Sequence, residues 1–114
     1  MSTDILADSV QLAKALAHPT RLRILALLHH GSLPVCQIAS VLHATESTVS
    51  GHLLDLRRSG VASEQRQGKF VYYRLSDDAP MGPVLDAMVA VLSTDPQIRQ
   101  DAALAASTRA AARD

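Results

Sequence analysis

The chain contains a single cysteine among its 114 residues, so no disulfide bond can form within it. Its first residues, MSTDILADS, have neither the basic flank nor the long apolar run of a secretory signal peptide. No uninterrupted apolar stretch approaches the length that spans a bilayer. We therefore expect a cytoplasmic protein with no membrane partner.

The chain also lacks a net charge: its eleven basic residues balance eleven acidic ones. The field of the whole molecule then gives no reason to expect nucleic acid or membrane. The charges are unevenly spread, however. Residues 21–74 carry seven basic side chains against three acidic ones, whereas residues 75–114 carry six acidic against three basic. Any contact with nucleic acid is therefore expected in the basic middle of the chain.

The sequence lacks the common catalytic motifs. It has no glycine-rich loop that could cradle a phosphate and no zinc-protease motif. Ser50, His52 and Asp55 are close in sequence, but helical periodicity points them in different directions. They cannot form a line of nucleophile, base and orienting group, so we do not expect an enzyme.

Hydrophobic periodicity predicts a series of helices. Residues 4–17 place apolar side chains on one helical stripe. The following HPT ends this helix, because proline disfavours helical geometry in the residue before it. Pro19 can open a second helix, which Gly31 closes. We expect Pro34 to start a short third helix. In its segment VCQIASVL, residues 35–42, the apolar residues fall at i, i+3, i+4 and i+7.

A fourth helix begins after Thr45, a good N-cap, and ends at Gly60. Valine and aromatic residues then alternate around a glycine turn in VASEQRQGKFVYYRL, which predicts two antiparallel strands joined near residues 67–69. A last amphipathic helix covers residues 80–92. Two short helices joined by a tight turn and followed at once by a small hairpin form a winged helix-turn-helix. The predicted fold class is thus mostly α with a small β-hairpin wing.

One side of the fourth helix suits a DNA major groove. At about 100° per residue, Val49, Leu53 and Leu56 cluster on one side, and the opposite side is centred near Gly51 and Arg58. Beside them lie Ser47, Thr48, Ser50 and Leu54. Small polar residues toward the N-terminal end let a helix enter a groove about 12 Å wide and reach base edges or phosphates.

The hairpin adds Arg66, Lys69 and Arg74, which are placed to meet phosphates as a wing. Each of these charges alone is more often part of a solvated face. The combination of helix pair, turn and basic hairpin favours DNA binding. The predicted DNA-binding residues are Ser47, Thr48, Ser50, Gly51, Arg58, Arg66 and Lys69.

Four segments together resemble the ArsR/SmtB family of bacterial metal-sensing and redox-sensing repressors, namely ALAHPTRLRILALL, LPVCQIASVL, ESTVSGHLLDLRRSG and GKFVYYRL. The resemblance covers residues 10–78, and its motifs occur in order. It implies a homodimer, built largely by the first and last helices, that binds a palindromic DNA operator and is released when an effector binds or a thiol is oxidised. The broad apolar face of the last helix independently favours a dimer.

Two residues depart from the family's pattern. Glu46 stands where members often carry glutamine, and a carboxylate near phosphates is unfavourable unless it accepts from a cytosine amino group or turns away. Gly51 stands where a longer polar or basic residue is common. Glycine inside a helix costs about 0.5–1 kcal/mol relative to alanine, so either close approach to DNA compensates or base readout is weaker here.

Cys36 lies in the first turn of the third helix, at the edge of its apolar stripe, so we expect partial access to solvent. Unpaired N–H groups and the positive end of the helix dipole lower the pKa of a thiol at such a position. The resemblance implies a C-x-C thiolate element of arsenic-sensing members here, but Pro34 occupies its first position. One thiolate is a poor site for a thiophilic ion that prefers three soft ligands.

The resemblance also implies a metal site on the last helix, and this site is degraded. Asp77 stands at its expected start. The next positions, where histidine or carboxylate would follow, are held by Ala79, Ala90 and Ser93, so zinc sensing is not expected there. Cys36 can be a redox or electrophile sensor, a remnant ligand for a metalloid such as arsenite, or a structural residue in a repressor whose effector binds elsewhere and does not depend on the thiol. We favour a thiol-based response, in which oxidation yields a sulfenic acid or a mixed disulfide.

Histidines offer little support for a metal site. His18, His29 and His30 lie on or beside the second helix and could join Cys36 only if the fold brings them close. Adjacent histidines at a helix end more often compensate the helix dipole. His52 projects near the apolar stripe of the fourth helix, and we expect it to be packed and to donate a hydrogen bond to the backbone.

The domain organisation follows from size and composition. A chain of this length with 47% apolar residues can close one modest core, so we predict a DNA-binding and dimerisation domain over residues 1–95. The alanine-rich residues 96–114 could extend the last helix, fold back as another helix or fray. A protein-interaction module is the alternative function, since winged helices also serve as docking units. Salt dependence of binding distinguishes the two.

Overall fold

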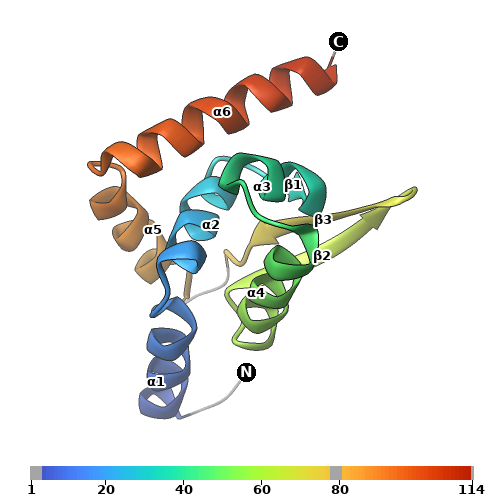
Figure 1. The fold of residues 1–114 in the computed structure, drawn as a ribbon. Helices are drawn as coiled ribbons and strands as arrows, with labels where there is room; N and C mark the ends of the chain where they lie inside the picture. Colours follow the sequence, from blue (N-terminus) through green and yellow to red (C-terminus); the bar gives the residue numbers. More distant parts are fainter. Residues whose placement is uncertain (1–3, 78–80, 114) are drawn as a thin grey trace.

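The computed structural model describes residues 4–77 and 81–113 (Figure 1). The elements are α1 (Ile5–Leu16), α2 (Pro19–His29), β1 (Leu33–Pro34), α3 (Val35–Leu42), α4 (Glu46–Arg58), β2 (Ala62–Gln67), β3 (Phe70–Leu75), α5 (Met81–Leu92) and α6 (Pro96–Arg113). The predicted helical fold with a small hairpin is confirmed. The predicted starting residue of the last helix, Pro80, lies outside the described residues. Within the described ranges, no helix is both long and apolar enough to cross a membrane.

Local signals set the helix ends. The Asp4 carboxylate accepts a hydrogen bond from the Ala7 N–H at 3.0 Å and so caps α1. The Thr45 hydroxyl accepts from the Thr48 N–H at 3.1 Å at the start of α4, as predicted. His43, with φ of 54°, has the left-handed conformation that ends α3. A left-handed residue followed closely by an N-cap explains why the turn between α3 and α4 is so short.

The sheet contains a third strand that periodicity did not predict. β1 pairs antiparallel with β3, which gives the strand order β1-β3-β2. This strand has only two residues, too few to show alternation, and its proline is tolerated because the strand lies at the edge. Pro34 is therefore the N-cap of α3 rather than its first helical residue, so that detail of the prediction was wrong by one position.

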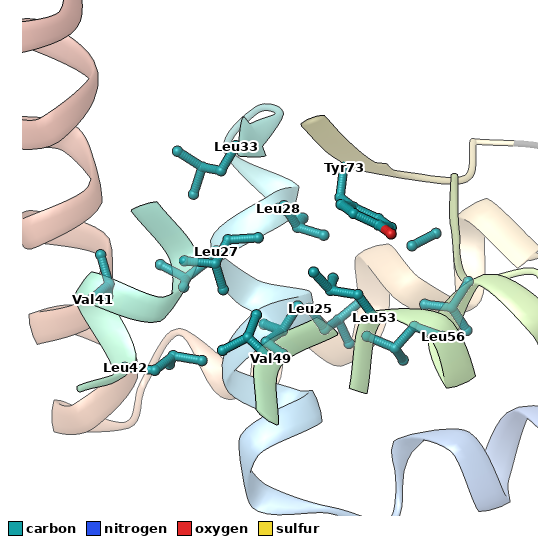
Figure 2. Packing of buried hydrophobic residues seen from close by; sticks show 14 of the residues in the cluster. Leu25, Leu27, Leu28, Leu33, Val41, Leu42, Val49, Leu53, Leu56 and Tyr73 are labelled. Atoms are coloured by element: carbon teal, nitrogen blue, oxygen red, sulfur yellow. The ribbon is translucent and has the colours of Figure 1, made fainter. Parts of the chain in front are cut away.

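The core is centred on α2. Figure 2 shows Leu25 and Leu27 of α2 among side chains from α3 and α4, which include Val49 and Leu53, while Tyr73 of β3 closes the cluster from the sheet. Leu25 and Leu53 are fully buried. Truncating such a leucine to alanine costs about 2–5 kcal/mol. This shared packing holds the helix pair and the hairpin in one unit.

The alanine-rich end forms α6, which folds back over α2 and α3 instead of extending α5 (Figure 1). The Asp95 carboxylate accepts hydrogen bonds from the N–H groups of Gln97 and Ile98 at the start of this helix. Ile98 and Ala105 are buried, and Ala105 belongs to the main core cluster. α6 thus shares the core with the preceding helices. The predicted division of the chain into a domain over residues 1–95 and a C-terminal segment over residues 96–114 stays a prediction.

Candidate nucleic-acid interface

α4 presents its small polar residues to solvent. Its apolar side is buried through Val49, Leu53 and Leu56. The residues predicted for DNA contact on this helix are all exposed, namely Ser47, Thr48, Ser50, Gly51 and Arg58. A Cβ at Gly51 would meet no atom within 4 Å. Packing inside the chain therefore does not require glycine at this position.

The first turn of α4 is organised by its cap. The Thr45 hydroxyl donates to the Thr48 hydroxyl, 3.0 Å away, so the Thr48 hydroxyl is an acceptor in this pair and keeps its own proton for another partner. Glu46 is exposed in the same turn, where a carboxylate interacts favourably with the helix dipole. Glu46 thus stabilises α4 independently of any contact with DNA.

The strand register places the basic residues of the wing on two faces. Arg66 pairs with Val71 and so shares the face that carries the buried Tyr73. Arg74 lies on the opposite face, where its guanidinium is 3.9 Å from the Asp77 carboxylate. The two arginines therefore cannot contact the same phosphate from one face of the hairpin.

The tip of the wing is the two-residue turn Gly68–Lys69. Gly68 has φ of 62°, a conformation that favours glycine. The Lys69 ammonium lies 5.5 Å from the centroid of the exposed Phe70 ring, within the range of a cation–π contact. The tip thus presents one cation and one aromatic ring to solvent.

Ion pairs separate the basic residues of the middle segment into two groups. Those with acidic partners are Arg21 with Asp55, Arg23 with Asp101, Arg57 with Glu64, and Arg74 with Asp77. Arg58, Arg66 and Lys69 are exposed and form no ion pair with any residue that the structure describes. These three are the basic residues of the predicted DNA site, and exposed cations without an acidic partner are available for phosphates.

An acidic residue of β2 joins the wing to α4. Glu64 accepts a hydrogen bond from the Tyr73 hydroxyl at 3.0 Å and is paired with Arg57 near the end of α4. Burial, and then the hydrogen bond to Glu64, raise the pKa of Tyr73. The wing is therefore attached to α4 by side-chain bonds as well as by apolar packing.

A second polar cluster joins α4 to α1 and α2, and sequence reasoning missed it. Arg21 Nε donates to Nδ1 of His52 at 3.0 Å, and the guanidinium is also paired with Asp55. The prediction that His52 donates to the backbone was wrong in this respect, because its Nδ1 accepts from a side chain. Burial, Arg21 and His18 lower the pKa of His52, while Asp55 acts in the opposite direction. Arg21 precedes His52 by 31 positions and Asp55 by 34 positions, and helical periodicity cannot relate residues that far apart.

Cys36 is exposed in the first turn of α3. No group of three histidine, cysteine, aspartate or glutamate side chains that could hold a metal ion occurs among the described residues. His29 is paired with Asp86, 3.2 Å away, and not with the thiol. The described residues of one chain therefore do not fit a site for arsenite or another thiophilic ion.

The degraded metal position near α5 is likewise without ligands in the part of the chain that the structure describes. The Asp77 carboxylate faces Arg74, and the Ser93 hydroxyl donates to the Val89 carbonyl at 2.8 Å. Ala90 carries no donor atom in its side chain, and Ala79 lies outside the described residues. Zinc does not fit these residues.

Apolar side chains remain exposed on α1 and α5. Leu6 is 77% exposed and Val91 is 70% exposed, and Ile5, Val10 and Val84 are also open to solvent. Figure 1 shows α1 and α5 on the side of the molecule away from the hairpin. Apolar faces of this kind, at a distance from the polar side of α4, are typical of surfaces that another protein covers.

Comparison with known proteins adds independent information. The family model described as bacterial regulatory protein, arsR family, matches residues 18–64. The arsenical resistance operon repressor of Escherichia coli K12 is 44% identical over 72 residues, which are 62% of this chain and 62% of the repressor. The chain spans 59–62% of the length of the first curated relatives it matches.

Solved structures agree with the fold. HlyU from Vibrio cholerae N16961 is similar with a TM-score of 0.71 and 30% identity, and the match covers 79% of this chain and 97% of HlyU. The homodimeric winged helix-turn-helix DNA-binding domain of Mb0332 from Mycobacterium bovis is similar with a TM-score of 0.69 and 28% identity, over 81% of this chain and 88% of that domain.

Proposed function

The chain belongs to the arsR family of bacterial regulatory proteins, and we propose that it is a transcriptional repressor that binds a palindromic DNA operator as a homodimer. One observation supports this most strongly. Arg58 at the end of α4 and Arg66 and Lys69 of the wing are exposed without an acidic partner in the described chain. The first turns of α4 expose the short polar side chains of Ser47, Thr48 and Ser50 beside Glu46. This is the combination that phosphate binding and groove entry require.

The homodimer is part of the same proposal. The exposed apolar side chains of α1 and α5 supply its interface, and a two-fold axis between them would carry two copies of α4 to two half-sites. The protein acts in the cytoplasm, where the DNA lies. A chain that stays monomeric at micromolar concentration in a sedimentation experiment would contradict this part of the proposal.

Selection of duplexes from a random pool tests DNA binding and yields the operator sequence in the same experiment. We expect the selected sequences to contain two inverted half-sites whose centres are about one helical turn apart. The affinity should fall linearly with salt on a log–log scale. Selection of no sequence, or binding that does not respond to salt, would instead favour a protein-interaction module.

Lys69→Gln and Arg57→Gln form a matched pair for the same assay. Lys69 makes no ion pair with the described residues, so its loss should weaken binding to all duplexes and reduce the salt slope by about 0.9. Arg57 is paired with Glu64, and its replacement should change the slope less. Equal slopes for the two variants would contradict the assignment of Lys69 to phosphate contact.

The effector response is proposed to act through Cys36. This thiol is exposed on α3, the helix that packs against α4, and no further ligand for a metalloid lies beside it in the described chain. Hydrogen peroxide would oxidise the thiol to a sulfenic acid and release water, or a small disulfide would form a mixed disulfide and release one thiol. Release from DNA by a peroxide, and not by arsenite, is expected. A Cys36→Ser protein that is released equally well would contradict the role of the thiol.

A further inference from the structure

We propose that Arg21 is a positioning residue for operator binding, which holds α4 at a fixed angle to α1 only while the ring of His52 is neutral. The inference rests on the proposed function, because it concerns how a dimer places its two recognition helices. It assigns a role to a polar cluster that lies beside the predicted DNA face and contains none of its residues.

The Arg21 guanidinium connects three helices. It belongs to α2, its Nη1 donates to the Ala15 carbonyl of α1 at 3.2 Å, and its Nη2 donates to the Asp55 carboxylate of α4. Its Nε donates to Nδ1 of His52 on α4 at 3.0 Å. The Arg21 side chain is only 12% exposed, so water competes little for these bonds. Each nitrogen of the guanidinium therefore has its own acceptor, and the acceptors lie on both α1 and α4.

The bond from Arg21 restricts the protonation state of His52. Nδ1 can accept only when it carries no proton, so the ring must be neutral with its proton on Nε2. A proton on Nδ1 would remove the acceptor and place a second positive charge beside the guanidinium. The titratable and charged groups that face His52 are Arg21, Asp55 and His18, whose ring centroid lies 5.8 Å away. Burial, Arg21 and His18 lower the pKa of His52 against the opposite effect of Asp55, which favours the neutral ring at neutral pH.

The position of α4 relative to α1 matters because α1 carries part of the proposed dimer face. In a two-fold dimer, the separation of the recognition helices must match half-sites whose centres lie about 34 Å apart. A rotation of α4 against α1 occurs in both protomers, so it changes the distance between the two copies of α4 twice over. Loss of the Arg21–His52 bond should therefore weaken binding to a correctly spaced double site more than binding to DNA of unrelated sequence, which needs only phosphates.

The test compares the affinity for the selected double-site duplex with the affinity for a scrambled duplex of equal length. Both are measured by fluorescence anisotropy on the full chain from about pH 7.5 to about pH 5.5 at constant salt. The ratio of the two affinities cancels the general gain of positive charge on histidines. We expect this ratio to fall at least about fivefold in the wild type as the pH falls.

His52→Asn is the decisive variant. The asparagine Oδ1 stands two bonds from Cβ, as Nδ1 does in histidine, and accepts the same bond without titrating. Its ratio should match the wild type at about pH 7.5 and stay flat as the pH falls. His30→Asn removes an exposed imidazole just after α2 and is the matched control, which should behave as the wild type. Arg21→Lys keeps the charge but has all three N–H donors on one nitrogen, so it cannot reach acceptors on both α1 and α4 as the planar guanidinium does. It should therefore lower the ratio at high pH and remove its pH dependence.

A wild-type ratio that does not change with pH, or an equal fall in His52→Asn, would overturn the inference. Salt-sensitive binding to the double site in those same measurements would leave the proposed function intact. NMR titration of the wild type gives a readout that does not depend on the folding of any variant. By linkage, binding to the double site should lower the pKa of His52 relative to that of His30, and equal changes would contradict the inference. A wild type that never prefers the double site would overturn the proposed function and this inference together.

Discussion

Two arginines of α2 hold two different helices, and the two attachments differ in burial. Arg21 and Arg23 are two residues apart, so they leave α2 on nearly opposite sides, about 200° from each other. The carboxylate that Arg23 binds on α6, Asp101, is 2% exposed, whereas the one that Arg21 binds on α4, Asp55, is 47% exposed. The Asp101 carboxylate of the α6 attachment is closed to water, whereas the Asp55 carboxylate of the α4 attachment is half-exposed and can exchange its bond with water.

The α6 side has further polar support. The Asp101 carboxylate accepts two hydrogen bonds from Arg23, at 2.8 and 2.9 Å, and a third from Gln97 at 3.0 Å. The hydrogen bond with Asp101 raises the pKa of Arg23 further. Arg109 of α6 donates to the carbonyls of Leu27 and Gly31 at the C-terminal end of α2. The C-terminal helix is therefore a fixed part of the fold, and α4 is the helix whose attachment can change.

Arg23→Met should produce the largest loss of stability. The substitution keeps an apolar stem but leaves the Asp101 carboxylate buried without its cation, which costs about 3 kcal/mol. Denaturant unfolding followed by circular dichroism measures this loss. Arg99→Met, on the exposed side of α6, is the control and should change the free energy of unfolding by less than about 0.5 kcal/mol.

Arg21→Met should cost less, about 1 kcal/mol, because water can solvate the half-exposed Asp55 after the guanidinium is removed. The same unfolding experiment compares it directly with Arg23→Met. An equal or larger loss for Arg21→Met would show that the two attachments do not differ in the way their burial indicates.

The pH dependence of stability should show the smallest effect. The pKa of His52 is lowered in the folded protein, so the unfolded chain binds this proton more readily. The resulting stabilisation is fully present above about pH 6.5 and is lost as the pH falls through the lowered folded value. Unfolding of the wild type and of His52→Asn at a series of pH values should show a steeper acid decline in the wild type. Parallel declines would contradict the lowered pKa.

The helices and the hairpin could be predicted because apolar residues recur along them with helical or strand periods. β1 could not, since two residues have no period. The course of α6 was left open for a related reason, as alanines on all sides give little contrast between a buried and an exposed face. The seven basic residues of the middle segment could be counted, but their partners could not be assigned. The pairing of Arg21 with Asp55 and of Arg57 with Glu64 is therefore known only from the structure.

The sequence by itself determined the helix pair, its cap at Thr45, the basic wing and the place of Cys36 in the first turn of α3, because each depends on residues close together in the chain. Only the tertiary structure decided which cations are neutralised. Arg21 meets Asp55 across 34 positions, and Arg23 meets Asp101 across 78. Such pairs form where packing brings two elements together, and packing is set by the whole apolar core rather than by any local pattern of residues.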